Sequence, residues 1–333
     1  MIKINNREIG GDSPTYIIAE MGINHNGSLD IAMKMIKEAA KCGVDAVKVQ
    51  IVDADKSYTK DSESHSLFKS VELKIKEWEV IVRSAEQLNI DIFATFAHAE
   101  DVIIANELQL PAIKVSSGNL TNFPLLKNVA KTGVSVLLST GLSYLSEVDE
   151  AVRYLEKNGN NQIGILHCTA LYPASPRDVN LLVIKTLRKA FPYPIGFSDH
   201  TKGICSAIAS VALGAKIIEK HFTLDRSMEG SDHCFSSTPE ELMQLVRSIR
   251  EIELSMGSSI KRPVSGEISL RDKLRRSIVA ARNIEKGEIL TEDKITAKRS
   301  KVKGLAPRYI EIIVGREVKK TISKDDPITM DLL

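Results

Sequence analysis

The sequence predicts an α/β protein in which a (β/α)8 TIM barrel is followed by a small β-rich domain. Eight short apolar runs alternate with amphipathic helical patterns over roughly 250 residues, which is the size of a TIM barrel. Beyond this region the chain changes to a polar stretch rich in Gly, Ser and Pro, and then to short β-like runs. We therefore expect a barrel at 1–256, a linker at 257–273 and a small domain at 274–333.

The eight apolar runs are expected to be strands of a parallel sheet. They are nearly continuous in Val, Ile, Leu and Ala, as strands buried on both faces are. Their unbroken alternation with helical patterns favours a closed barrel over a doubly wound sheet. In chain order the runs are YIIAEMG (16–22), AVKVQ (46–50), DIFATF (91–96), AIKVSSG (112–118), SVLLSTG (135–141), IGILHCT (163–169), PIGFSDH (194–200) and KIIEKHF (216–222).

Helical patterns fill the connections between these runs, and several end in Gly or Asn, as helix C-termini often do. The connection at 51–75 is longer and polar, so we expect a surface loop there, with a mobile lid as the alternative. After a last helix at about 240–256, Lys-Gly, Lys-Asp-Asp and Asp-Pro mark turns in the small domain. A domain of this size is barely stable alone, so we expect it to dock on another part of the protein.

The composition gives no reason to expect a nucleic-acid or membrane partner, since 45 basic and 43 acidic residues leave a net charge of +2. The first residues lack the apolar core of a signal peptide, and no apolar run is long enough to span a bilayer. Four scattered cysteines without a CxxC pair fit reduced thiols. We therefore expect a cytoplasmic protein.

Nearly every predicted strand ends in polar or ionisable residues. Active sites of TIM barrels lie at the carboxyl ends of the strands, so these residues predict a site. Lys48 and Lys114 lie inside apolar runs, where a lysine is costly to bury unless an anion pairs with it. The substrate is therefore expected to be anionic. The strand ends carry Glu20, Lys48, Gln50, Thr95, Lys114, Ser116, Ser117, Ser139, Thr140, His167, Thr169, Ser198, Asp199, His200, Lys220 and His221.

Two histidines, His200 and His221, end the seventh and eighth predicted strands, which are neighbours in a barrel. Two imidazoles with open positions beside them suit manganese, cobalt or zinc, whereas a closed structural zinc site would need four ligands. The alternative is a pair of structural histidines. His25 is expected to contact a substrate or to form a hydrogen bond in its loop, and His233 to lie beside the site or at the surface.

Several segments taken together resemble the sialic acid synthase family. They are AEMGINHNGS, AVKVQ, IKVSSGNLTNFPLL, LLSTG, LHCTALYPASPRDVNL, GFSDHTKGI, VALGAKIIEKHFTLD and GSDHCFS. The region at 274–333 resembles the antifreeze-like (SAF, β-clip) domain that follows the barrel in that family. The likeness covers essentially the whole chain, in order, and the combination of AExGxNHNG with SDH-x20-H is specific to it.

The resemblance implies a transferase that condenses phosphoenolpyruvate with an N-acylated mannosamine-type sugar. The product would be a nine-carbon 2-keto acid, N-acetylneuraminate or legionaminate, and phosphate would be released. A divalent metal ion is implied, with Mn²⁺ expected and Co²⁺ or Mg²⁺ as alternatives. A domain-swapped homodimer is also implied, in which each small domain caps its partner's barrel.

The resemblance also implies roles for individual residues. His200 and His221 match the metal ligands, and Glu20 and Asp232 match carboxylates that orient the sugar or move protons. The expected phosphoenolpyruvate contacts are Lys48, Thr95, Lys114, Ser117, Ser139 and Ser198. The expected sugar contacts are Gln50, Tyr172, Asp232 and Arg299.

The chain departs from the family pattern at four places. Thr95 is followed by Phe96 instead of proline, Asn119 stands where Glu is common, and Ala170 replaces Asn or Ser. Arg299 is followed by Ser-Lys-Val-Lys instead of a Pro-Gly run. These departures leave two alternatives open. One is another phosphoenolpyruvate-dependent synthase, making pseudaminate or using a sugar-phosphate acceptor; the other is a catalytically silent homologue that binds sugar or metal.

Overall fold

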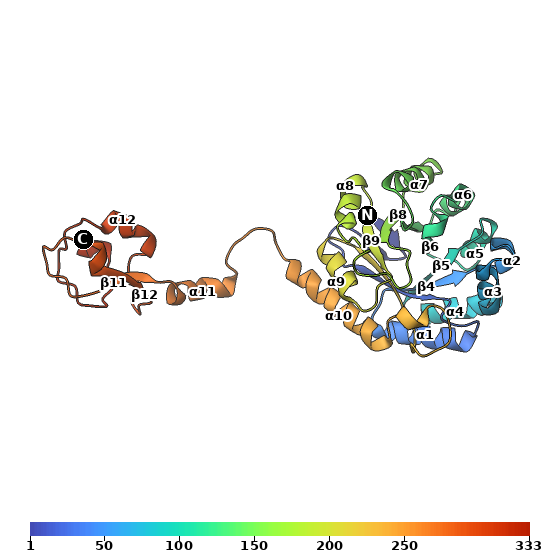
Figure 1. The fold of residues 1–333 in the computed structure, drawn as a ribbon, viewed down its shortest axis with the longest axis horizontal. Helices are drawn as coiled ribbons and strands as arrows, with labels where there is room; N and C mark the ends of the chain where they lie inside the picture. The colour runs from blue at the N-terminus through green and yellow to red at the C-terminus, as the bar shows by residue number, and fades with distance from the viewer. The chain divides into compact units, whose positions relative to one another are not determined.

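The predicted barrel is confirmed in a computed structural model that describes residues 1–333 (Figure 1). The chain divides into two compact units, Met1–Gly257 and Ser258–Leu333. In the first unit eight parallel strands close on themselves, with the last strand pairing with the first. The strands are β3 (Tyr16–Gly22), β4 (Ala46–Ile51), β5 (Asp91–Phe96), β6 (Ala112–Val115), β7 (Ser135–Ser139), β8 (Ile163–Cys168), β9 (Ile195–Asp199) and β10 (Ile217–His221).

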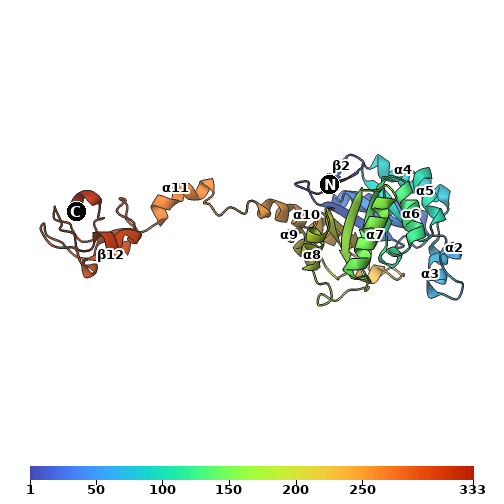
Figure 2. The same cartoon turned by 90° about the horizontal axis from the view of Figure 1, so that it is seen from above.

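Helices cover the outside of the barrel, and Figure 2 shows α6 and α7 side by side there. The first helix begins where the Ser28 side chain accepts a hydrogen bond from Ile31 N, and it ends at Gly43, whose φ of 80° suits glycine. No helix is long and apolar enough to cross a membrane. The covering helices are α1 (Leu29–Cys42), α4 (Ile75–Gln87), α5 (Ile103–Glu107), α6 (Phe123–Lys131), α7 (Leu145–Lys157), α8 (Val183–Ala190), α9 (Cys205–Ala212) and α10 (Pro239–Met256).

The connection at 51–75 is more ordered than the surface loop that the sequence predicted. It contains two short helices, α2 (Ala54–Ser57) and α3 (Glu63–Val71). Asp53 and Ser62 cap their N-termini, which explains why a polar sequence forms helices here. Single 3₁₀ turns occur elsewhere, at η1 (Glu100–Val102), η2 (Ser117–Asn119), η3 (His233–Phe235), η4 (Glu292–Lys294), η5 (Pro307–Tyr309) and η6 (Met330–Leu332).

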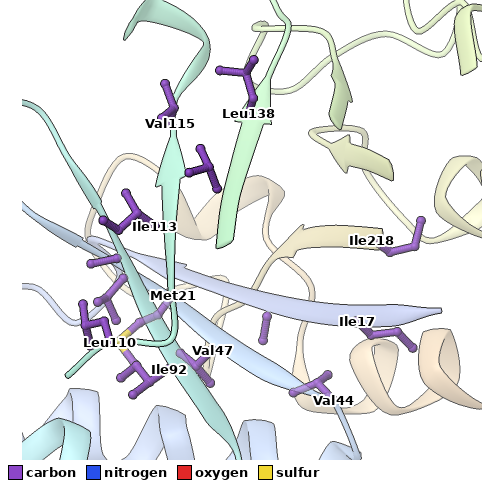
Figure 3. Close-up of a cluster of buried hydrophobic side chains, with 14 of the residues drawn as sticks. Ile17, Met21, Val44, Val47, Ile92, Leu110, Ile113, Val115, Leu138 and Ile218 are labelled. Atoms are coloured by element: carbon purple, nitrogen blue, oxygen red, sulfur yellow. The ribbon is translucent and has the colours of Figure 1, made fainter. Parts of the chain in front are cut away.

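Alternation along the strands separates two apolar layers. One set of side chains points outward and packs under the helices, as Ile17, Val47, Ile92 and Ile113 do in Figure 3. The other set fills the barrel at the amino ends of the strands. There the hairpin of β1 (Ile2–Ile4) and β2 (Arg7–Ile9) adds three isoleucines to an inner cluster of Tyr16, Ile18, Ala46, Phe93, Ala112, Leu137, Leu166 and Ile217. Polar side chains inside the barrel can therefore lie only at the carboxyl ends of the strands.

The second unit has an apolar core of its own. Strands β11 (Ser277–Ala280) and β12 (Ile295–Lys298) pair antiparallel, and isolated bridges extend the β structure to residue 327. Helix α11 (Ser265–Leu274) occupies much of the stretch expected to be a linker, and α12 (Ile310–Ile313) follows later. The core consists of Ile278, Ala280, Ile284, Leu290, Ile295, Ile313, Val318, Ile322, Ile328 and Leu333.

One buried ion pair lies on the outer face of the barrel sheet. Lys220 Nζ donates to Asp199 Oδ2 at 2.9 Å and also to the carbonyl oxygen of Thr201. The two charged residues are 1% and 0% exposed. Burial lowers the pKa of Lys220, and Asp199 only partly offsets this effect. Each of the two residues therefore needs the other in order to stay buried in its charged form.

Replacing Lys220 with methionine should destabilise the barrel by about 3–5 kcal/mol, because Asp199 would be left buried and unpaired. Urea unfolding followed by the fluorescence of Trp78, the single tryptophan, measures this unit alone. Arg153→Met is the control, since it removes an exposed pair with Asp149 and should cost less than about 1 kcal/mol. Equal losses in the two variants would contradict the prediction.

Candidate active site

A cavity of about 570 Å³ opens at the carboxyl ends of the strands. Every barrel residue to which the family resemblance gives a role lines this cavity: Glu20, Lys48, Gln50, Thr95, Lys114, Ser117, Ser139, Tyr172, Ser198, His200, His221 and Asp232. Arg299 belongs to the second unit, where its Nε donates to the carbonyl oxygen of Leu274 at 3.2 Å.

Several strand-end residues face away from the cavity. Thr140 Oγ1 donates to the carbonyl oxygen of Leu166 at 3.0 Å, and His167 Nε2 lies 2.6 Å from that of Val179. Asp199 and Lys220 form the outer ion pair described above. In each case the neighbouring residue along the strand, such as Ser139 or Cys168, is the one that lines the cavity.

Two groups of lining residues were missed by the sequence reasoning. Cys168 and Glu219 project from β8 and β10, and alternation along each strand could have revealed them. Tyr58, Ser64, Leu67 and Phe68 come from the segment of α2 and α3. The rings of Tyr58 and Phe68 stack with centroids 5.2 Å apart, so an aromatic wall bounds one side of the cavity. No short-range sequence signal assigns that wall to the site.

Four charged side chains form a buried cluster at the base of the cavity. Lys48 Nζ lies 2.9 Å from Glu20 Oε1 and 4.0 Å from Glu219 Oε2. Lys114 Nζ lies 3.6 Å from Glu219 Oε1. All four residues are at most 4% exposed. Each lysine therefore has the carboxylate partner that its burial requires.

The two glutamates differ sharply in their affinity for protons. Burial, reinforced by Glu219, raises the pKa of Glu20 from 4.5 to about 7, although Lys48 acts in the opposite direction. Burial also acts to raise the pKa of Glu219, but Lys114, Lys48 and a hydrogen bond from Ser198 lower it to about 2. Near neutral pH, Glu219 is thus ionised, whereas Glu20 readily gains or loses a proton. A carboxyl with that pKa is suited to proton transfer.

Hydroxyl groups surround the lysines. Lys48 Nζ donates to Thr95 Oγ1 at 3.0 Å, and Lys114 Nζ donates to Ser139 Oγ at 2.6 Å. Ser117 Oγ accepts from Gly141 N at 3.1 Å. Two ammonium groups with several hydroxyls in one cavity offer charge-assisted hydrogen bonds to an anion bearing carboxylate or phosphate oxygens.

The two imidazoles lie together at the rim, with ring centroids 5.4 Å apart. His200 Nδ1 lies 2.8 Å from the carbonyl oxygen of Thr169, which can only accept, so Nδ1 carries a hydrogen and Nε2 faces the cavity. His221 Nδ1 is buried and has no hydrogen-bond partner, and Asp232 Oδ2 lies 3.6 Å from it. Burial, together with the charge of His200, lowers the pKa of His221 well below 6.5, which keeps it neutral.

These donors fit a divalent metal ion of borderline softness. The unpartnered Nδ1 of His221 and Nε2 of His200 offer two nitrogens, and the Asp232 carboxylate lies 3.6 Å from His221 Nδ1. Burial disfavours the charged form of His200, but Cys168 and the Thr169 carbonyl raise its pKa overall, so a metal ion would displace a proton there. No group of three or more His, Cys, Asp or Glu side chains is arranged to hold a metal ion, so the two imidazoles would be the protein ligands and substrate or water would complete the shell.

The other two histidines considered earlier do not line the cavity. His25 is buried, its Nδ1 accepts from Gly27 N at 3.2 Å, and its ring lies edge-on to Trp78 at 5.5 Å. The loop hydrogen bond that the sequence suggested for His25 is therefore present. His233 is fully buried, with Nδ1 2.7 Å from Thr223 Oγ1, so the suggestion of a surface position was wrong.

Of the departures from the family pattern, Asn119 lines the cavity and Ala170 lies in the loop after β8. Asn119 Nδ2 donates to Ser116 Oγ at 3.1 Å, so its amide is engaged within its own loop. A Cβ added to Gly141 would come within 3.2 Å of the Ala170 Cβ, and the loops after β7 and β8 therefore pack closely. The small side chain of Ala170 suits this contact.

Comparison with known proteins gives one consistent result. Residues 35–261 match the model of the NeuB family, and residues 275–333 match that of the SAF domain. The chain is 47% identical to an uncharacterized protein of Methanocaldococcus jannaschii, over 99% of this chain and 98% of that protein. It is 39% identical to the N,N'-diacetyllegionaminic acid synthase of Campylobacter jejuni, over 94% and 98% of the two chains.

Two further similarities extend this result. The human N-acetylneuraminate-9-phosphate synthase is 38% identical over 98% of this chain and 95% of its own. The crystal structure of the N-acetylneuraminic acid synthetase of Leptospira borgpetersenii superposes with a TM-score of 0.77. That comparison covers 82% of this chain and 96% of the other, at 36% identity.

The Glu20→Gln variant should lose a pH dependence of stability that the wild-type protein has. Because the folded-state pKa is raised, the contribution of Glu20 to stability is fully present below pH 4.5 and is lost as pH rises through about 7. The free energy of unfolding of the wild type, relative to the variant, should therefore fall by up to about 3 kcal/mol across this window.

Urea unfolding at a series of pH values, followed by Trp78 fluorescence, measures this difference. Glu219 titrates below its ordinary value and contributes only at lower pH, so it does not confound the window. A difference between wild type and variant that stays constant from pH 4.5 to 8 would show that the pKa of Glu20 is not raised.

Proposed function

Because the chain belongs to the NeuB family, we propose that it condenses phosphoenolpyruvate with an N-acylated mannosamine-type sugar and releases phosphate. The product is a nine-carbon 2-keto acid of the sialic acid type. The observation that carries the proposal is the convergence of Lys48, Lys114, His200 and His221 in one cavity with three carboxylates. The lysines would bind an anion, and the histidines would hold a metal ion that polarises a carbonyl group, within the same cavity.

Phosphoenolpyruvate would bind over the two lysines. Its negative charge is met by Lys48 and Lys114, and the surrounding hydroxyls of Thr95, Ser117, Ser139 and Ser198 fix its orientation. Glu219 stays ionised and holds both ammonium groups toward the cavity. An anion of this charge would favour the protonated form of Glu20, which leaves a net positive cluster beneath it.

The sugar would bind above this cluster, in its open-chain aldehyde form. His200 and His221 would hold the divalent ion, for which we expect Mn²⁺, with Co²⁺ or Mg²⁺ as alternatives. When bound, such an ion supplies Lewis-acid polarisation of a carbonyl oxygen. Gln50 and Tyr172 also line the cavity and are suited to hold the sugar.

The reaction forms one carbon–carbon bond, and at C2 it replaces the bond to the phosphate oxygen with a bond to the oxygen of water. C3 of phosphoenolpyruvate bonds to the aldehyde carbon, and the aldehyde oxygen takes up a proton. Water adds to C2 and loses one proton, which leaves a tetrahedral carbon bearing a hydroxyl and the phosphate. That hydroxyl loses its proton as the C2 carbonyl forms, the bond between C2 and the phosphate oxygen breaks, and inorganic phosphate leaves. Glu20, with a pKa of about 7, is suited to move these protons, and Asp232 to orient the sugar hydroxyls.

The acceptor that we favour is N-acetylmannosamine or a 2,4-diacetamido-trideoxy sugar, giving N-acetylneuraminate or legionaminate. Relatives named for legionaminic acid and for N-acetylneuraminate 9-phosphate are about equally similar, so identity does not separate them. No arginine and no lysine beyond Lys48 and Lys114 lines the cavity within the barrel, which argues against a phosphorylated acceptor. A pseudaminic acid synthase is less similar, at 30% identity.

The proposal includes a domain-swapped homodimer in which the small domain of one protomer caps the barrel of the other. Arg299 would then reach the sugar in the partner's cavity. A cytoplasmic location is also part of the proposal. All four cysteines are free, as expected in a reducing compartment.

Phosphate release from phosphoenolpyruvate tests the proposal. The protein is stripped with EDTA, supplied again with Mn²⁺, and offered N-acetylmannosamine, its 6-phosphate or the 2,4-diacetamido-trideoxy sugars separately. We expect metal-dependent release with one acceptor, which is lost in His200→Ala and His221→Ala. His65→Ala is the matched control, because His65 pairs with Asp55 outside the cavity. Bound Mn²⁺ without release from any acceptor would favour a catalytically silent homologue.

Replacing Lys114 with methionine should raise the KM for phosphoenolpyruvate by about 10- to 100-fold, because a charge-assisted bond to the anion is lost. The KM for the acceptor sugar should change far less. Lys37→Met, on the exposed face of α1, provides the control. Initial rates of phosphate release at varied concentrations of each substrate measure both constants. An unchanged KM for phosphoenolpyruvate would remove Lys114 from the proposed binding site.

A further inference from the structure

The loop at 222–238, which carries Asp232, has almost no regular structure of its own. Its two ends lie side by side, since Thr223 N donates to the carbonyl oxygen of Ser237 at 3.0 Å. Ser237 N donates in turn to the carbonyl oxygen of His221 at 2.8 Å. The middle of the loop, and with it the carboxylate of Asp232, must therefore be held by neighbouring elements.

One asparagine in the turn after β3 contacts this loop at two points. Asn24 Nδ2 donates to the carbonyl oxygen of Phe222 at 2.8 Å and to Ser236 Oγ at 3.1 Å. Ser236 Oγ donates in turn to the backbone carbonyl oxygen of Asp232 at 2.6 Å. Asn24 is 1% exposed, so water does not compete for these bonds. A chain of two hydrogen bonds thus joins Asn24 to the backbone of Asp232.

A second asparagine in the same turn contacts the other side of the loop. Asn26 Nδ2 donates to the carbonyl oxygen of Glu229 at 2.8 Å, and Asn26 Oδ1 lies 3.4 Å from His233 Nε2. A Cβ added to Gly230 would lie 2.7 Å from His233 Cδ2 and 3.0 Å from Asn26 Oδ1. The packing therefore requires glycine at position 230, and the contact between turn and loop is close.

We propose that Asn24 and Asn26 are positioning residues that hold Asp232 in the active-site cavity. The inference rests on the proposed function, because the role of Asp232 in binding the acceptor sugar is part of that proposal. Asp232 Oδ2 lies 3.6 Å from His221 Nδ1, so a small shift of the loop would change its position relative to the sugar. Misplacement by about 1 Å can cost about 100-fold in rate.

The Asn26→Gly variant tests the inference with little risk to the fold. Asn26 has a φ of 50°, a conformation that glycine adopts freely, so the turn should persist while both amide contacts are lost. We expect the KM for the acceptor sugar to rise about tenfold, while the KM for phosphoenolpyruvate changes less than about twofold. Asn89→Gly is the matched control, because Asn89 has a φ of 54° and is exposed after α4.

A double-mutant cycle with Asp232→Asn separates positioning from a direct role. If Asn26 acts through Asp232, Asn26→Gly should have little further effect on kcat/KM in the Asp232→Asn background. The Asn26→Asp variant, which keeps the side-chain shape and loses the donor to Glu229, should show part of the defect. Additive effects in the cycle, or an unchanged KM in Asn26→Gly, would overturn the inference.

Hydrogen exchange keeps this test separate from that of the proposed function. If the wild-type protein releases no phosphate with any acceptor, the proposed function fails, yet the turn can still be tested as a support of the loop. Backbone amides at 222–238 should exchange faster in Asn26→Gly than in the wild type, and should be unaffected in Asn89→Gly. Unchanged exchange across this loop in Asn26→Gly would overturn the inference.

Discussion

The site depends on one interaction, the pairing of two lysines with two glutamates inside the barrel. Lys48 and Lys114 could not be buried without Glu20 and Glu219, and neither glutamate could be buried without a lysine. The hydroxyls of neighbouring strands are aligned by the same ammonium groups. Substitution of any one of the four residues would therefore change the charges and hydrogen bonds of the others.

The barrel provides the frame that makes this cluster tolerable. The apolar layer of the β1–β2 hairpin and the first half of each strand closes the opposite end, so water reaches the charges only through the mouth. Low polarity beneath the cluster strengthens each electrostatic interaction within it. Rigid strands place the charges, whereas the histidines and Asp232 lie at strand ends and in a loop, where other turns support them.

The sequence predicted the strands well because strands buried on both faces leave a continuous apolar signal. It predicted the strand-end site residues because a lysine in such a run is conspicuous. It did not predict Glu219, which faces the cavity as His221 does. The adjacent Lys220 was counted among the site residues instead, although it points outward and pairs with Asp199. The contacts of Asn24 with Ser236 could not be predicted, since they join segments that only the closed barrel brings together.

Because its pKa is raised to about 7, Glu20 can take up or release a proton near neutral pH. At neutral pH only part of the protein molecules carry a proton on this carboxyl. An anion that enters the cavity would increase the protonated fraction. Binding of an anion at the proposed site would therefore be coupled to uptake of a proton from solvent, and the heat of binding would depend on the ionisation enthalpy of the surrounding buffer. Protonation of Glu20 would remove one negative charge from beneath such an anion without any change in the fold.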